Sequence, residues 1–364
     1  MVEIGSNKKI KGQALTAEIM AGSGSNFVLQ NLGGRMDYIS YKDKNVLITG
    51  GLGFIGSSLT YRLVDCGAKV TLVDSLVPDY GGNMFNIKGI EDKVKVNISD
   101  VRDQFSMNYL VQGQDYIFNL AGTLSHIDSM LDPFTDLQIN CVSQLSILEA
   151  CRKHNTGVKI IFAGTRGQYG TAKYLPVDEK HPVVPIDVNG INNLAGEYYH
   201  ILYNNVYGIR ACSLRLTNTF GPRHQMKHHK QGIINWFIRL LIEGKKIQIF
   251  GNGRQVRDIN YIDDAVEAFL AAGSSEKTNG EVFNIGGTPL SLEDLVKLMI
   301  KVYGKGGYEL IPYPKENKKI EIGDYVADYT KIKNLLGWKP EVAIEEGLKR
   351  SFDYYKKHKQ FYWK

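Results

Sequence analysis

The sequence has few of the features that mark secreted, metal-binding or membrane proteins. Its 364 residues include only four cysteines, Cys66, Cys141, Cys151 and Cys212, which lie singly within apolar segments and lack the paired spacing of a disulfide framework or metal site. It also has no run of about 18 apolar residues, and no cationic N-terminal segment precedes a long apolar one. We therefore expect a cytoplasmic protein with buried thiols and no membrane contact.

A strong charge of either sign is also missing. The 44 Lys and Arg residues nearly balance the 38 Asp and Glu residues, and the Lys-rich stretches 315–319 and 356–359 are typical of solvated surface. No nucleic-acid-binding module is recognisable. In RHQMKHHKQG (223–232), the adjacent His228 and His229 cannot both face one ion from a regular element, and no carboxylate or cysteine completes a set. We predict no metal and no nucleic acid; this segment is better explained as a substrate loop whose Arg223 or His224 touches phosphate.

Strand-like and helix-like segments alternate from Asn45 onward. Residues 1–40 show no clear strand or helix period and predict a flexible tail or extension. Helical spacing near 140–154 and 192–207 separates β-branched runs, which lie at 45–51, 69–74, 94–100, 115–122, 159–165 and 210–218. This pattern predicts an α/β fold with a doubly wound, Rossmann-type parallel sheet over 41–218. The less regular part, 219–364, predicts a smaller, discontinuous α/β substrate domain, from which segments near 255–290 can return to the first domain.

A glycine-rich turn follows the first strand. In TGGLGFIG (49–56), Gly50, Gly53 and Gly56 stand between a strand and a helix, where backbone amides can approach a pyrophosphate. Asp74 follows 21 residues after Gly53, at the end of the second strand, where its carboxylate can accept hydrogen bonds from the adenosine ribose and repel a 2'-phosphate. The spacing predicts NAD as the cofactor, in preference to NADP.

Further motifs extend this pattern over most of the chain. They are NLAGTLSHIDSMLDP, GTRGQYG, NGINNLAGE, LRLTNTFGPR, GNGRQVRDINYIDD and LLGWKP. With TGGLGFIG, they make the chain from about Lys44 to Tyr355 resemble the NAD-dependent epimerase/dehydratase family, which consists of extended short-chain dehydrogenases/reductases acting on nucleotide sugars. The motifs specify the family and do not specify one reaction.

The resemblance implies contacts for both ligands. On the cofactor side it implies residues that contact the dinucleotide or line its cleft, and an asparagine that supports the site. These residues are Phe54, Ile55, Asp100, Val101, Leu120, Ala121, Thr123 and Asn140. On the substrate side, a nucleoside-diphosphate sugar, it implies that Arg257 binds the diphosphate and that Asn218 contacts the substrate. Asp324 would lie near the nucleotide ribose, although the basic residue that usually flanks this position is absent. Arg166 can bind substrate, close the pocket or form a structural ion pair.

The family's acid and base are both replaced. Its members use a Ser or Thr with a Tyr and a Lys; Thr165 fits the first position, but Asn189 and Asn193 occupy the other two. An amide does not ionise near neutral pH, so Asn189 can orient a hydroxyl but cannot act as its general base. Candidate substitutes, relayed through Thr165 and water, are His126, Asp128 and Tyr169.

Three functions remain open for such a chain. It is a redox enzyme with a substitute base, a slow catalyst of one half-reaction, or a regulatory or scaffold protein that keeps NAD or a nucleotide sugar as a bound ligand. Within the family, 4,6-dehydration is disfavoured because Arg166 and Gly167 stand where dehydratases carry an Asp-Glu pair, so C4 epimerisation or oxidation fits better. The resemblance also implies a homodimer through the helices beginning near Ser129 and Asn192.

Overall fold

A seven-stranded parallel sheet forms the centre of the protein, as the sequence predicts. The computed structural model describes residues 28–30, 36–78, 80–230, 232–313 and 321–363. Along the sheet the strands are β12 (Val282–Ile285), β8 (Arg210–Leu216), β7 (Lys159–Thr165), β6 (Tyr116–Asn119), β3 (Asn45–Thr49), β4 (Lys69–Asp74) and β5 (Val94–Ile98). The order reverses direction beside β3, which places a ligand crevice at the carboxyl ends of β3 and β6.

Helices cover both faces of this sheet, which explains the continuous apolar strands. Neighbouring residues of β3 point to opposite sides: Leu47 belongs to one buried cluster, and Val46 and Ile48 to the other. On the Leu47 side lie α2 (Gln104–Leu110), α5 (Ser143–His154) and α6 (Val188–Tyr207). The other side is covered by α1 (Phe54–Asp65) and α8 (Ile262–Ser274).

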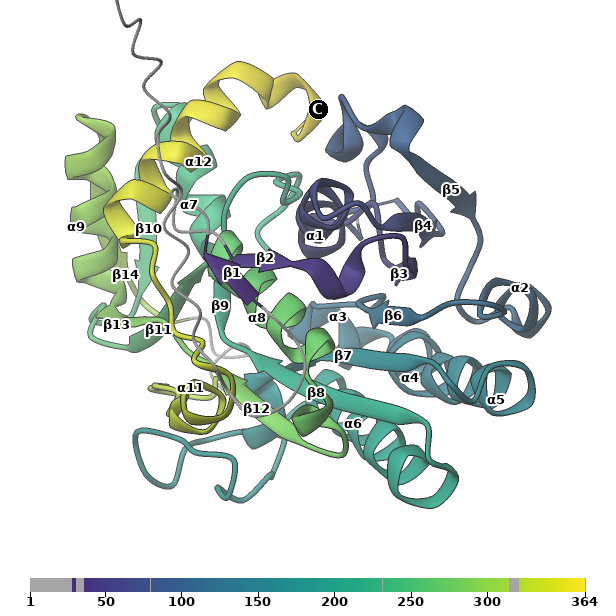
Figure 1. The fold of residues 1–364 in the computed structure, drawn as a ribbon. Helices are drawn as coiled ribbons and strands as arrows, with labels where there is room; N and C mark the ends of the chain where they lie inside the picture. Colours follow the sequence, from purple (N-terminus) through teal and green to yellow (C-terminus); the bar gives the residue numbers. More distant parts are fainter. Residues whose placement is uncertain (1–27, 31–35, 79, 231, 314–320, 364) are drawn as a thin grey trace, which may run out of the picture.

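The second half of the chain builds a smaller region beside the sheet (Figure 1). One sheet has the order β13 (Thr288–Ser291), β11 (Val256–Tyr261) and β9 (Asn218–Phe220), and a parallel pair joins β10 (Ile247–Phe250) to β14 (Tyr308–Ile311). The helices of this region are α7 (Ile233–Ile242), α9 (Leu292–Tyr303), α11 (Thr330–Leu336) and α12 (Ile344–His358). Although β12 comes late in the sequence, it pairs with β8 and extends the main sheet.

The structure differs from the sequence prediction near the N-terminus. Residues 1–27 lie outside the described residues, but β1 (Val28–Gln30) and β2 (Met36–Tyr38) pair as antiparallel strands where no strand was expected. Tyr38 and Tyr41 are buried, and the Tyr41 hydroxyl donates to the carbonyl of Leu270 at 2.8 Å. Two aromatic anchors in a short segment leave no periodic signal, so the predicted boundary at residue 40 was wrong for this segment.

The long helix α6 also begins earlier than the predicted position near Asn192. Its N-cap is Asp187, whose carboxylate accepts a hydrogen bond from the Gly190 amide at 2.7 Å.

Among the described residues, no helix has both the length and the apolar content needed to cross a membrane.

Candidate functional site

One cleft, with a volume of about 310 Å³, collects most of the residues singled out from the sequence. It opens at the carboxyl ends of β3, β4, β6 and β7 and is bordered on the other side by residues of the second region. The predicted residues that line it are Gly50, Gly53, Phe54, Ile55, Gly56, Asp74, Asp100, Val101, Leu120, Ala121, Thr123, His126, Asn140, Thr165, Arg166, Asn189, Asn193 and Asn218. Because the parallel strands end at one edge, residues far apart in the sequence meet there.

The glycine turn is built for close backbone approach. Gly50 has φ of +66°, a conformation that favours glycine, and a Cβ on Gly56 would lie 2.3 Å from the carbonyl oxygen of Gly50. The turn leads directly into the N-terminus of α1, whose free amides suit a phosphate. These features fit the pyrophosphate of a dinucleotide.

Asp74 stands at the end of β4, within reach of the same cleft. Its two carboxylate oxygens accept hydrogen bonds from the amides of Leu52 (3.1 Å) and Leu76 (3.0 Å), which fixes the carboxylate beside the glycine turn. Burial raises its pKa, although these two amides oppose the rise. Each oxygen keeps a second lone pair, so the carboxylate can still accept hydrogen bonds from ribose hydroxyls.

A buried polar network surrounds Asn189. Asn189 is 2% exposed, and its Nδ2 donates to the carbonyl of Thr123 (2.8 Å) and to Asp136 (3.0 Å). Asp136 also accepts hydrogen bonds from the side chains of Thr123, Asn140 and Asn192. Both donor hydrogens of Asn189 are thus committed to the protein, and its role in the structure is to hold this network together.

Asn193 lies one helical turn further along α6. Its Nδ2 donates to the backbone carbonyl of Asn189 at 2.9 Å and also approaches the side-chain oxygen of Asn189 at 3.3 Å. The two asparagines therefore lie one helical turn apart and supply neither a proton acceptor with a suitable pKa nor a cation.

A histidine–carboxylate pair lies near Thr165. His126, the first residue of α3 (His126–Leu131), places Nδ1 2.6 Å from a carboxylate oxygen of the 2% exposed Asp187. Among the described residues, Nε2 of His126 has no hydrogen-bond partner. The Cε1 of His126 and the Oγ1 of Thr165 both lie within 3.6 Å of the position that a Cβ on Gly167 would occupy. The imidazole and the threonine hydroxyl therefore border the same space, which Gly167 leaves open because it has no side chain.

The carboxylate of Asp187 is suited to orient this imidazole. Burial pushes its pKa upward, but the hydrogen bond and charge of His126, together with the Gly190 amide, outweigh burial and hold the pKa below its ordinary value. The carboxylate stays ionised and can accept the Nδ1 hydrogen, which directs the lone pair of Nε2 outward.

The other two candidate bases are engaged elsewhere. Asp128 forms a 2.8 Å ion pair with Lys230, which joins α3 to the loop before α7. Tyr169 is fully buried, donates to Asn284 at 2.7 Å and lies under the guanidinium of Arg215. Burial raises the pKa of Tyr169 to about 12, so this residue serves packing.

The predicted substrate residues divide into two groups. Arg166 and Asn218 line the cleft, whereas Arg257 and Asp324 do not. Arg257 forms a 2.6 Å ion pair with Glu321 and donates to the carbonyl of Gly323. Asp324 accepts a hydrogen bond from the amide of Val256.

The histidine-rich loop reaches the cleft through His224. This ring is buried beside Gly232 and lies edge-on to Phe54, and burial lowers its pKa to about 4. Arg223 stacks instead on Tyr61, 4.2 Å from the ring centroid. In the part of the chain that the structure describes, no three His, Cys, Asp or Glu side chains form a group able to hold a metal ion.

Sequence reasoning missed Asp187 and Asp136. Asp187 had one local signal, because an Asp directly before a helical segment is a typical N-cap. Its contact with His126, 61 residues away, has no signal in the sequence. Asp136 lies between motifs, and its role follows only from the packing of Pro133–Leu137 (α4) against α6.

Comparison with known proteins places this site within a family. Residues 47–351 match the family model described as GDP-mannose 4,6 dehydratase. A putative UDP-glucose 4-epimerase of Methanocaldococcus jannaschii is 34% identical over 315 residues, which are 85% of this chain and 98% of that protein. The structure of UDP-glucose 4-epimerase with UDP-glucose from Thermotoga maritima has a TM-score of 0.78 at 33% identity, with 86% of this chain and 99% of that chain covered.

A Thermus thermophilus UDP-glucose 4-epimerase in complex with NAD has a TM-score of 0.76 at 27% identity, covering 86% of this chain and 99% of the other. The chain belongs to the NAD-dependent epimerase/dehydratase family of extended short-chain dehydrogenases/reductases, whose members include nucleotide-sugar epimerases and dehydratases. Because the family includes both epimerases and dehydratases, membership does not decide which reaction this chain performs.

Proposed function

We propose that this protein is an NAD-dependent enzyme that oxidises a nucleoside-diphosphate sugar at a ring carbon, as an epimerase or C4 dehydrogenase, with His126 as its general base. The observation that carries the proposal is the His126–Asp187 pair beside Thr165, in the same cleft as the glycine turn and Asp74. In the same cleft, Asn189, which we assign to the position of the family's tyrosine, is committed to a structural network.

The proposed chemistry needs a proton acceptor and an aligned hydroxyl. His126 Nε2 takes the proton of the sugar hydroxyl while Asp187 holds the opposite ring nitrogen and stabilises the imidazolium that forms. Thr165 Oγ1 accepts the amide of Gly167 at 3.2 Å, which leaves its own hydrogen for the sugar oxygen. NAD, when bound, accepts the hydride from the same carbon, so that the O–H and C–H bonds are replaced by a C=O bond. Epimerisation returns the hydride to the opposite face of the ketone.

The residues that would hold NAD are those of the glycine turn and Asp74. The approach of Gly50 and Gly56 leaves no space for a side chain in the turn, and the adjacent start of α1 provides free amides. Asp74, fixed by two backbone amides, supports the preference for a ribose over a 2'-phosphate.

The test mixes purified protein and NAD with UDP-, GDP-, CDP- and dTDP-sugars in turn. Reduced nicotinamide is followed by its near-ultraviolet absorbance, and epimerised sugar by NMR. We expect one sugar to react, and His126→Asn to lower kcat by about 10²- to 10⁴-fold, which is the contribution of a general base. His154→Asn, at the exposed end of α5, is the matched control.

Two outcomes contradict the proposal. If His126→Asn retains full activity, the base is another group. If only an Asn189→Tyr/Asn193→Lys double variant reacts, the natural protein has lost this redox step, and its alternative role as an NAD- or nucleotide-sugar-binding regulatory or scaffold protein is supported.

We also propose that the protein forms a homodimer through the helices at the α6 face. Four apolar side chains on one side of α6 are about half exposed or more: Ile191, Tyr198, Leu202 and Val206. Leu131 and Phe134, on α3 and α4, are more than three-quarters exposed. Exposed apolar side chains gathered on neighbouring helices are typical of a protein–protein interface.

A further inference from the structure

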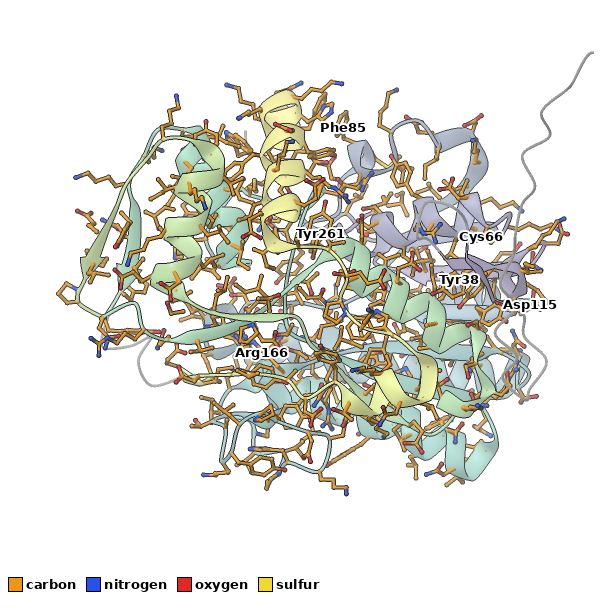
Figure 2. All side chains as sticks on the ribbon, turned by 60° about the vertical axis from the view of Figure 1, so that its left-hand side comes forward. Tyr38, Cys66, Phe85, Asp115, Arg166 and Tyr261 are labelled. Atoms are coloured by element: carbon orange, nitrogen blue, oxygen red, sulfur yellow. The ribbon has the colours of Figure 1, made fainter. Side chains whose placement is uncertain are left out.

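Arg166 is a cleft residue whose side chain forms no ion pair with the residues that the structure describes. It directly follows Thr165, and Figure 2 shows it well inside the outline of the molecule. Among the described residues, its Nη1 is buried without a hydrogen-bond partner, and its Nη2 makes only a 3.5 Å contact with the side-chain oxygen of Asn218. A buried guanidinium nitrogen without an acceptor is unusual, because arginine donors in protein interiors are normally paired.

The carboxylates nearby accept hydrogen bonds from groups other than Arg166. Both oxygens of Asp187 are engaged, one by the amide of Gly190 and the other by His126. The oxygens of Asp258 accept the amides of Gly287 and Ala327, both at 2.8 Å.

Glu321 is a third described carboxylate that acts on this charge. One of its oxygens accepts from Arg257 and the other from the hydroxyl of Tyr313. None of these three carboxylates accepts a hydrogen bond from Arg166, so its guanidinium lies near negative groups without being paired with one of them.

The surroundings hold Arg166 loosely in place. Its guanidinium carbon lies 5.5 Å from the ring centroid of Tyr325, within the range of a cation–π contact. Asn218 is fixed by its own Nδ2, which donates to the carbonyl of Asp258 at 3.2 Å and so turns its oxygen toward Arg166. Burial, with the nearby charge of Arg257, lowers the pKa of Arg166 to about 10, so the side chain remains charged at neutral pH. A charged fork held only by weak contacts can turn toward an anion in the cleft.

We infer that Arg166 binds an anionic oxygen group of the nucleotide sugar, next to the carbon on which Thr165 and His126 act. This inference rests on the proposed function and adds that the substrate carries a negative charge at this subsite. Two parts of a nucleotide sugar offer the same chemistry, namely the diphosphate and a carboxylate on the sugar ring, and a guanidinium fork matches either one.

Calorimetric titration of the NAD-loaded protein separates these sources. The probes are UDP, UDP-glucose and UDP-glucuronate, or the corresponding dTDP, CDP or GDP compounds if the activity panel selects another nucleoside. We expect Arg166→Gln to weaken binding by about 10- to 100-fold and Arg166→Lys to cause a smaller loss, because lysine keeps the charge without the fork. Arg152→Gln, which removes an exposed arginine on α5, is the control.

The pattern of losses identifies the bound group. An equal loss for all three probes supports the diphosphate, whereas a loss confined to UDP-glucuronate supports a sugar carboxylate. Unchanged affinity for every probe overturns the inference. If the unmodified protein binds none of the nucleotide probes, the proposed function itself fails. That result is distinct from nucleotide binding that the Arg166 substitutions leave unchanged.

Thermal unfolding without ligand distinguishes a binding role from a structural one. Removing an unmatched buried charge should leave the melting temperature of Arg166→Gln equal to or above that of the unmodified protein. A melting temperature lower by several degrees would show that Arg166 holds the fold together, and would overturn the inference even if binding also weakened.

Discussion

Replacing Asp187 by Asn tests whether His126 is oriented and stabilised for proton transfer. Asparagine is as good an N-cap as aspartate, so α6 keeps its first hydrogen bond to the Gly190 amide. What is lost is the charge beside His126 Nδ1, 2.6 Å away in the native protein. The imidazolium formed during oxidation would then have no counter-ion.

The size of the effect follows from the geometry. Two unit charges about 4 Å apart interact by about 4 kcal/mol at an effective dielectric constant of about 20. His126 is 40% exposed while Asp187 is 2% exposed, so solvent screening reduces this to about 2 kcal/mol. A barrier higher by about 2 kcal/mol lowers kcat by about 30-fold.

Steady-state kinetics with the reacting sugar measure this loss. We expect kcat to fall about 30-fold, while KM for the sugar and the dissociation constant for NAD change by less than about 3-fold, because Asp187 binds neither ligand. Asp103→Asn makes the same substitution at the N-cap of α2, outside the cleft, and should leave kcat unchanged. An unaltered kcat for Asp187→Asn, or an equal loss in the Asp103 variant, would refute the role given to the pair.

Three further results are expected. Gly56→Ala should abolish NAD binding, followed by the change in protein fluorescence on titration with NAD, because its Cβ would lie 2.3 Å from a backbone oxygen of the turn. Gly157→Ala, whose Cβ would meet no atom within 4 Å, should leave NAD binding unchanged. Burial lowers the pKa of both His200 and His224 to about 4, so the unfolded chain binds more protons than the folded protein below about pH 6.5. The free energy of unfolding should therefore fall by about 1.4 kcal/mol per pH unit for each histidine as the pH is lowered to about 4. Urea-unfolding midpoints that stay constant over this pH range would contradict the expectation. Leu202→Lys, on the exposed α6 face, should halve the mass measured by light scattering if the protein is a dimer; an unchanged dimer mass would place the interface elsewhere.

Local patterns in the sequence were sufficient for the sheet and the cofactor turn. Strand β7 occupies the predicted range, 159–165. A short apolar, β-branched run of this kind is typical of a strand in a parallel sheet that helices cover on both faces. Gly50, Gly56 and Asp74 share one cleft because a strand, a turn, a helix and a second strand can pack in only one hand. The asparagines at positions 189 and 193, which the resemblance predicts as replacements for the family's Tyr and Lys, were likewise visible in the sequence alone.

Only the tertiary structure decided what those replacements do. Asn189 is bound into a network around Asp136, and His126 is paired with Asp187, because helices α3, α4 and α6 pack together at the edge of the sheet. Such contacts join residues about 50 to 60 positions apart, and their geometry depends on helix packing for which short motifs carry no signal. For the same reason the sequence left Arg166 with three possible roles, whereas the structure shows its charge unmatched within the described protein.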